Sequence, residues 1–135
     1  MSITEAFFTT LETDGIDAAL VHVDPDAVFV ASRREPHSDI PLFGEFKGHA
    51  GVRDFVQALG SFSRMNMTIE SRAQDGALEF MAGQLDHIVG KTGKPFKSLF
   101  GLVCTIRNGK ILRYVIIEDT ARLEAAFEMT EGASA

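Results

Sequence analysis

Three turn signals in the second half of the chain constrain the fold most, because they divide it into four consecutive strands. Asp75-Gly76, Thr92-Gly93-Lys94 and Asn108-Gly109 each combine glycine with residues that favour tight turns. Asn-Gly between apolar segments is the strongest short-range signal for a β-hairpin. Residues 65–118 are therefore predicted to form an antiparallel meander.

The strands of this meander are expected to bend. The first alternates apolar Met65, Met67 and Ile69 with polar neighbours, which is typical of a sheet with one buried face. The second, over 77–89, carries Gly83 near its centre, where glycine often marks a bulge or a sharp bend. Long bent strands allow a sheet to curl, so we expect a curved sheet rather than a flat one.

Helical patterns flank this meander. Ser2 and Glu5 have the spacing of a capping box, and Asp119 is placed to cap a helix after the last strand. Apolar residues then recur at helical spacing in several segments. These patterns predict helices over 3–14, 16–21, 48–59 and 121–128, and a short strand over 27–31.

The order of elements predicts an α+β fold in which helices pack on one face of an antiparallel sheet. A chain of 135 residues has the usual size of one domain with one core. We therefore predict a single domain over 1–130 and a flexible C-terminal tail over 131–135.

Charge and composition exclude several classes of partner. The net charge is −6 and the basic residues are scattered, which argues against nucleic acid as a partner. No apolar run approaches the roughly 20 residues that cross a bilayer, and the four histidines show no metal-ligand spacing. The only cysteine, Cys104, is expected to be buried and inert. We expect a cytoplasmic protein without membrane, metal or cofactor.

Several motifs, taken in order, resemble a known family. Residues 43–52 read Phe-Gly-Glu-Phe-Lys-Gly-His-Ala-Gly-Val; Thr92-Gly93-Lys94 and Asn108-Gly109-Lys110-Ile111 follow, with Asp119 ten residues beyond the hairpin glycine. They resemble the SnoaL-like branch, of polyketide cyclase type, of the nuclear transport factor 2-like superfamily. The resemblance implies a cone-shaped roll, a curved sheet wrapped around N-terminal helices with a pocket between them, and frequent dimers. The superfamily holds cyclases, isomerases, epoxide hydrolases and non-enzymes, so the fold alone does not choose a chemistry.

The catalytic residues that the resemblance implies are incomplete in this sequence. The helix-one tyrosine of the ketosteroid isomerases corresponds to Phe7, and their base falls near residues 31 and 32, where no acid is present. The aspartate of the cyclases and limonene-type epoxide hydrolases, seven residues after the hairpin glycine, corresponds to Ile116. The Arg and Asp of the hydrolases' long strand correspond to Gln84 and Asp86, so only the second is kept.

The candidate site combines polar side chains from one predicted face of the sheet. If the Asn108-Gly109 turn sets the register, Val103 lies opposite Tyr114, and Gln84 and Asp86 share that face. A carboxyl group desolvated by apolar neighbours has a raised pKa and suits general acid or base work, whereas one at a strand end can simply be solvated. We predict Asp86 and Tyr114 as catalytic residues. The predicted ligand-pocket residues are Gln84, Glu118, Ile116, Val103, Phe80, Phe7 and Phe55.

Two functions remain open. The first is acid-base catalysis without a cofactor, of isomerase, cyclase or hydrolase type, on a small, largely apolar organic molecule. The second is a non-catalytic module for ligand binding or dimerisation. Leu85, His87, Leu112 and Ile69 are predicted on the outer sheet face, which is then too apolar to be fully hydrated, so a homodimer is expected.

Overall fold

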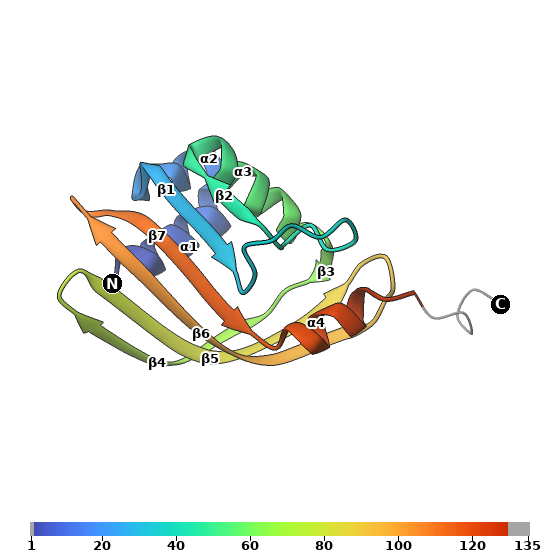
Figure 1. Ribbon diagram of the computed structural model, residues 1–135. Helices are drawn as coiled ribbons and strands as arrows, with labels where there is room; N and C mark the ends of the chain where they lie inside the picture. Colours follow the sequence, from blue (N-terminus) through green and yellow to red (C-terminus); the bar gives the residue numbers. More distant parts are fainter. Residues whose placement is uncertain (1, 130–135) are drawn as a thin grey trace.

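The sheet curls around the N-terminal helices, as Figure 1 shows in this computed structural model, which describes residues 2–129. The helices are α1 (Ile3–Asp14), α2 (Ile16–Ala19), the 3₁₀ turn η1 (Leu20–His22), α3 (Gly48–Leu59) and α4 (Thr120–Phe127). The strands are β1 (Val23–Ala31), β2 (Glu45–Lys47), β3 (Phe62–Arg64), β4 (Met67–Asp75), β5 (Leu78–Val89), β6 (Pro95–Arg107) and β7 (Lys110–Glu118). Helices α1, α2 and α3 lie on the concave side, and α4 follows β7 at the opposite end (Figure 1). The tail predicted over 131–135 lies outside the described residues.

The strand order confirms the predicted meander. The strands form one sheet in the order β2-β1-β7-β6-β5-β3, and β4 pairs with another part of β5. Every pair in the meander is antiparallel, while β1 runs parallel to β7. This last pairing brings the N-terminal half of the chain beside the final hairpin strand. The predicted α+β fold, with a curved sheet around helices, is confirmed.

The N-terminus of α1 is fixed to the sheet by hydrogen bonds. Ser2 Oγ accepts from the Glu5 N–H at 3.1 Å, as the capping pattern predicts. The buried carboxylate of Glu79, on β5, accepts from the N–H of Ile3 and from both the N–H and the hydroxyl of Thr4, at 3.1, 2.9 and 2.7 Å. A carboxylate at this end of a helix is also favoured by the helix dipole. Helix α1 is thereby anchored over the concave face.

Gly83 allows the bend that the sequence predicts. A Cβ atom added there would lie 1.8 Å from the carbonyl oxygen of Thr68 on β4. Opposite this glycine the β4–β5 register shifts between Ile69 and Ser71, so β4 bulges where it crosses the middle of β5. Because a side chain would prevent this close approach of two backbones, glycine is required at the bend.

A second bulge, in the last hairpin, was not predicted. The hairpin pairs Ile106 with Ile111 as the turn requires, but the next pair is Thr105 with Arg113. Strand β7 therefore contains one extra residue, Leu112, beside the turn. A slip of one residue exchanges the two faces of a strand relative to its neighbour.

The face prediction for β5 and β6 was wrong for this reason. Cys104, rather than Val103, lies opposite Tyr114. On β5 the buried positions are the odd-numbered ones, including Leu85 and His87. On β5 and β6 the concave face is therefore formed by residues that a hairpin without the bulge would place on the outer face.

The other predicted elements differ only at their ends. Helices 3–14 and 48–59 are confirmed in both bounds, whereas helix 16–21 is a short α-helix followed by a 3₁₀ turn. Strand β1 starts before the predicted 27, because Val23 pairs with Ile111 of β7 and the carboxylate of Asp24 accepts from the Arg107 guanidinium of β6 at 3.0 Å. The strands β2 and β3 have three residues each, too few to show a period. Within 2–129 no helix combines the length and apolar character that crossing a bilayer requires.

Candidate functional site

A cavity of about 610 Å³, here called the inner cavity, lies between the concave sheet face and helices α1 and α3. Most of its wall is apolar and comes from both layers. Its helical side includes Phe7, Phe8, Phe55 and Leu59, and its sheet side includes Met67. Sites of this volume with apolar walls hold small organic molecules.

Tyr114 is fixed within an aromatic cluster on the cavity wall. Its ring stacks on Phe29, with centroids 4.4 Å apart and planes 5° apart, and the edge of Phe55 meets it at 5.6 Å. The residue is only 3% exposed, and its hydroxyl makes no hydrogen bond with any described residue. Tyr114 belongs to the wall of the inner cavity.

The hydroxyl of Tyr114 is a permanent hydrogen-bond donor near neutral pH. Burial raises its pKa well above the ordinary value, and Cys104 and Glu118 act in the same direction wherever they are ionised. The group therefore stays protonated, and it can donate to an oxygen of a bound molecule.

Glu118, at the end of β7, lines the inner cavity and also a hollow on the outer sheet face that is described below. Its N–H donates to Ser32 Oγ at 3.1 Å, which holds the strand end against the segment after β1. No described residue forms a hydrogen bond or ion pair with its carboxyl group. Burial raises the pKa of Glu118 to about 7. At neutral pH the group is thus divided between its acid and base forms, which suits proton transfer.

His87 is a third polar group on the wall, from the middle strand β5. It is 4% exposed and packs beside Phe62, with ring centroids 4.7 Å apart. Its Nδ1 receives a hydrogen bond of 3.1 Å from the Asn66 N–H. Burial lowers the pKa of His87, so the neutral ring is the stable form.

Five of the predicted site residues line the inner cavity. They are Tyr114, Glu118, Ile116, Phe7 and Phe55. The structure therefore brings together the tyrosine and one of the predicted carboxylates, on the same face of β7 with Ile116 between them. Ile116, which the resemblance matches to the cyclase aspartate, is apolar, and the carboxyl group of Glu118 lies two residues further along the same strand face.

The other four predicted site residues do not point into the inner cavity. They are Gln84, Asp86, Phe80 and Val103. The Asp86 carboxylate lies 3.5 Å from the Arg64 guanidinium, and the Gln84 amide donates to Glu70 at 3.4 Å, both on the outer face. The physical reason is the bulge at Leu112, which exchanges the faces of β5 and β6. The prediction that Asp86 converges with Tyr114 was wrong.

The same inversion corrects the residues expected on the outer face. Leu85, His87 and Ile69 line the inner cavity instead. The signal that could have placed them is the contrast between the two faces of β6, because Phe96 and Phe100 are apolar and Lys97 is charged. Burying the phenylalanines and exposing the lysine requires the observed register.

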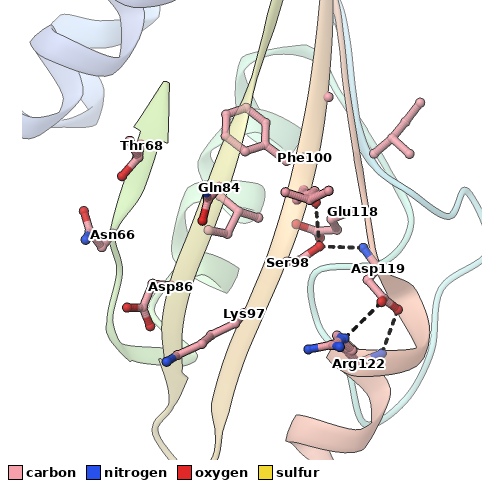
Figure 2. A pocket seen from close by; sticks show the side chains of 14 residues that line it. Asn66, Thr68, Gln84, Asp86, Lys97, Ser98, Phe100, Glu118, Asp119 and Arg122 are labelled. Carbon is pink, nitrogen blue, oxygen red and sulfur yellow. Dashed lines mark hydrogen bonds and ion pairs between the residues drawn. The ribbon is translucent and has the colours of Figure 1, made fainter. Parts of the chain in front are cut away.

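The outer face carries a second hollow of about 830 Å³, here called the outer groove, which Figure 2 shows from close by. It runs over β4, β5 and β6 to the start of α4, and Gln84 and Asp86 belong to it. At its edge Ser98 Oγ accepts from the Asp119 N–H at 2.9 Å. Asp119 accepts from the Arg122 N–H at 3.0 Å, which confirms its predicted role as a helix cap.

The remaining histidines make structural contacts or lie on the surface. His49 Nε2 lies 2.8 Å from the Val23 carbonyl oxygen, and His22 Nε2 lies 3.2 Å from the Thr10 hydroxyl. Among the described residues, no group of three or more His, Cys, Asp or Glu side chains is arranged to hold a metal ion.

The family follows from the sequence match. The family model of the SnoaL-like domain matches residues 4–114, which is most of the chain. The chain belongs to the SnoaL-like domain family. A comparison of this SnoaL-like domain with curated protein sequences gives no match.

Solved structures show the same fold at low sequence identity. TerC, crystallised with polyporic acid, is 21% identical with a TM-score of 0.77, over 93% of this chain and 95% of that one. An NTF2-like protein of unknown function from Burkholderia pseudomallei is 17% identical with a TM-score of 0.79, over 93% and 94%. A Catenulispora acidiphila protein with a ketosteroid isomerase-like fold, in complex with trimethylamine, is 11% identical with a TM-score of 0.71, over 95% and 93%. This SnoaL-like domain therefore has the NTF2-like fold.

Proposed function

We propose that this SnoaL-like domain binds a small, largely apolar organic molecule in the inner cavity and that Glu118 transfers a proton to or from it, without a cofactor. The observation that carries the proposal is a carboxyl group without a protein partner in an apolar cavity, where burial raises its pKa to about 7. A group of this kind can act as a base in one step and as an acid in the next.

Tyr114 has a complementary role in this proposal. Removing a proton next to a carbonyl group places negative charge on the carbonyl oxygen, and a neutral hydroxyl in a dry wall stabilises that charge. The ring of Tyr114 is held by Phe29 and Phe55, so the hydroxyl needs no reorganisation to donate. An isomerase, a cyclase or a hydrolase could each use such a pair of groups.

The likeness to known proteins supports a small organic ligand. The solved structure of TerC contains polyporic acid in a protein of the same fold. In this chain the resemblance aligns the cyclase acid with Ile116, and Glu118 offers a carboxyl group from the same strand face. Two residues along a strand correspond to roughly 6.6 Å, so the reacting atom is expected at a different depth.

A proton-exchange experiment tests the proposal without knowledge of the substrate. The probe is 2-tetralone, an apolar ketone with acidic α-protons, and 1H NMR in D2O follows their exchange. The wild-type protein is expected to accelerate exchange over a buffer blank, and Glu118→Gln is expected to lower the acceleration by about 10² or more. Glu70→Gln, which changes an exposed glutamate of β4, is the matched control.

The outcomes of this experiment separate the two carboxylates. Loss of exchange in Asp86→Asn with full exchange in Glu118→Gln would return the catalytic role to the outer-face residue. The absence of any acceleration by the wild-type protein, despite probe binding, would favour the non-catalytic binding module.

We also propose that the domain forms a homodimer through the outer groove. Leu99 and Ile117 are 74% and 61% exposed there, which is unusual for large apolar side chains on a sheet. The groove also carries acidic Asp86 opposite basic Lys97, and basic Arg122 beside acidic Asp119. In a two-fold interface each patch meets its own copy, so a patch with both charge signs is self-complementary.

Light scattering tests the dimer. The double variant Leu99→Lys with Ile117→Lys is expected to be monomeric at concentrations where the wild-type protein is dimeric. Val21→Lys, at an exposed apolar position away from the groove, is the matched control. A monomeric wild-type protein at micromolar concentration would contradict the interface.

The buried single thiol of Cys104 supports the proposed cytoplasmic location.

A further inference from the structure

The proposed proton transfer leaves one buried titratable group of the inner cavity without a role. His87 packs beside Phe62 and Phe96, with ring centroids 4.7 and 6.1 Å away. Its side chain is 4% exposed and its ring is held by apolar contacts. A buried polar group in such a position needs a hydrogen-bond partner, either from the protein or from a bound molecule.

A backbone hydrogen bond fixes the hydrogen on this imidazole ring. The Asn66 N–H lies 3.1 Å from Nδ1. Because a backbone N–H can only donate, the ring atom that faces it is an unprotonated nitrogen. The neutral ring then carries its hydrogen on Nε2. Burial disfavours the doubly protonated form and lowers the pKa of His87.

Nε2 is the ring nitrogen left for a molecule in the inner cavity, because Nδ1 is already engaged by the Asn66 N–H. Burial, which lowers the pKa of the ring, has a larger effect than the Asp86 backbone and carboxylate, which raise it, and keeps the ring neutral. Since His87 lines the inner cavity and does not line the outer groove, a molecule reaches this nitrogen from inside.

We infer that His87 is a ligand-binding residue that selects molecules carrying an uncharged hydrogen-bond acceptor, such as a ketone or ether oxygen. This inference rests on the proposed ligand-binding role of the inner cavity. An N–H donor in an apolar wall gains a hydrogen bond from such an oxygen, whereas a hydrocarbon of the same shape leaves it unpaired. A cationic ligand is disfavoured at this end, because the ring offers only a donor.

The strand register gives the position of the selected acceptor. Glu118 pairs with Phe100, which pairs with Gly83, and His87 lies four residues further along β5. Two strand spacings of about 4.8 Å and four residues of about 3.3 Å place His87 roughly 16 Å from Glu118 along the contour of the sheet. The concave curvature shortens the straight distance, so one elongated molecule can meet both groups.

The test compares two probes of equal shape, 2-acetylnaphthalene and 2-isopropylnaphthalene, by isothermal titration calorimetry. The quantity measured is the ratio of the hydrocarbon Kd to the ketone Kd. In His87→Phe, which keeps an aromatic ring beside Phe62 and Phe96, this ratio is expected to fall about three- to tenfold. His37→Phe, the same exchange at an exposed histidine outside the inner cavity, is the matched control and is expected to keep the ratio. Tyr114→Phe, which removes the other donor of the cavity, shows whether the preference belongs to Tyr114 instead.

The wild-type protein provides a second measurement that needs no variant. Long-range 1H–15N NMR of the imidazole is expected to show the Nε2–H tautomer, and the ketone alone is expected to shift the Nε2–H signal. An Nδ1–H tautomer, an unchanged ratio in folded His87→Phe, a ratio lost only in Tyr114→Phe, or failure of both probes to bind would each overturn the inference. These experiments measure binding, so their outcome is independent of the proton-exchange experiment. If His87→Phe lowers the Kd ratio but the wild-type protein does not accelerate proton exchange, the role of His87 is supported and only the role of Glu118 is removed.

Discussion

Replacing Glu118 with glutamine is expected to stabilise the folded protein at alkaline pH and to leave its stability nearly unchanged in acid. Burial in the inner cavity raises the pKa of Glu118 from 4.5 to about 7. No described residue compensates the ionised carboxylate with a hydrogen bond or an ion pair. Ionisation in the folded state therefore costs free energy that the isosteric, uncharged amide does not cost.

The sign follows from proton binding. The carboxyl group ionises near pH 4.5 in the unfolded chain and near pH 7 in the folded protein. Between these values the folded state binds more protons than the unfolded state, so the contribution of Glu118 is fully present below the unfolded pKa and is lost as pH rises through the folded pKa. At about 1.4 kcal/mol per pKa unit, the gap corresponds to about 3 kcal/mol above pH 7.

Urea denaturation at about pH 4 and about pH 8.5 measures this effect. The free energy of unfolding of Glu118→Gln is expected to exceed that of the wild-type protein by about 3 kcal/mol at the higher pH and by under about 0.5 kcal/mol at the lower. The subtraction cancels His87 and all other groups that both proteins share. Glu70→Gln, the exposed control, should change stability by under about 0.5 kcal/mol at both values. An equal gain at both pH values, or no gain at the higher one, would refute the reasoning.

Three further predictions concern the fold. Gly83→Ala is expected to cost more than about 3 kcal/mol in urea denaturation, because its Cβ would overlap the Thr68 carbonyl oxygen, whereas Gly101→Ala, with open space around it, should change stability by under about 0.5 kcal/mol. Glu79→Ala is expected to cost about 3 kcal/mol or more, since it removes the charged acceptor of three hydrogen bonds to the start of α1; an unchanged midpoint would remove this anchor from the account. Cys104, whose pKa burial raises to about 12, should react with a thiol reagent only after unfolding, and rapid labelling of the folded protein would contradict its burial.

The fold could be predicted because its signals are local and consistent. Turn dipeptides separate the strands, Gly83 marks the bend, and the apolar spacing of 48–59 marks α3. Each of these signals depends on few neighbouring residues. The three-residue strands β2 and β3 could not be predicted, because a period cannot be seen in so short a segment.

The site was only half predicted because it depends on register across three strands. On β7, Tyr114, Ile116 and Glu118 share the face that lines the inner cavity, and their roles there remain predictions. The positions on β5 were inverted by one extra residue, Leu112, that no local signal in the hairpin reveals. A bulge is identified by its effect on distant packing, so the charge of Lys97 and the apolar Phe96 were the only guides.

The bulge also determines where the polar chemistry of the inner cavity lies. With this register Glu118 is joined through Phe100 to Gly83, at the bend of β5. Tyr114 pairs with Cys104 of β6, which pairs with Glu79 of β5. His87 lies eight residues beyond Glu79 along β5, on the other side of the bend at Gly83. The resemblance would place a cyclase acid at Ile116, one step closer to the tyrosine. If Glu118 transfers the proton and His87 donates to the ligand, as proposed above, the arrangement favours a molecule whose reacting atom lies at the bend and whose oxygen acceptor reaches the β3 end of the sheet.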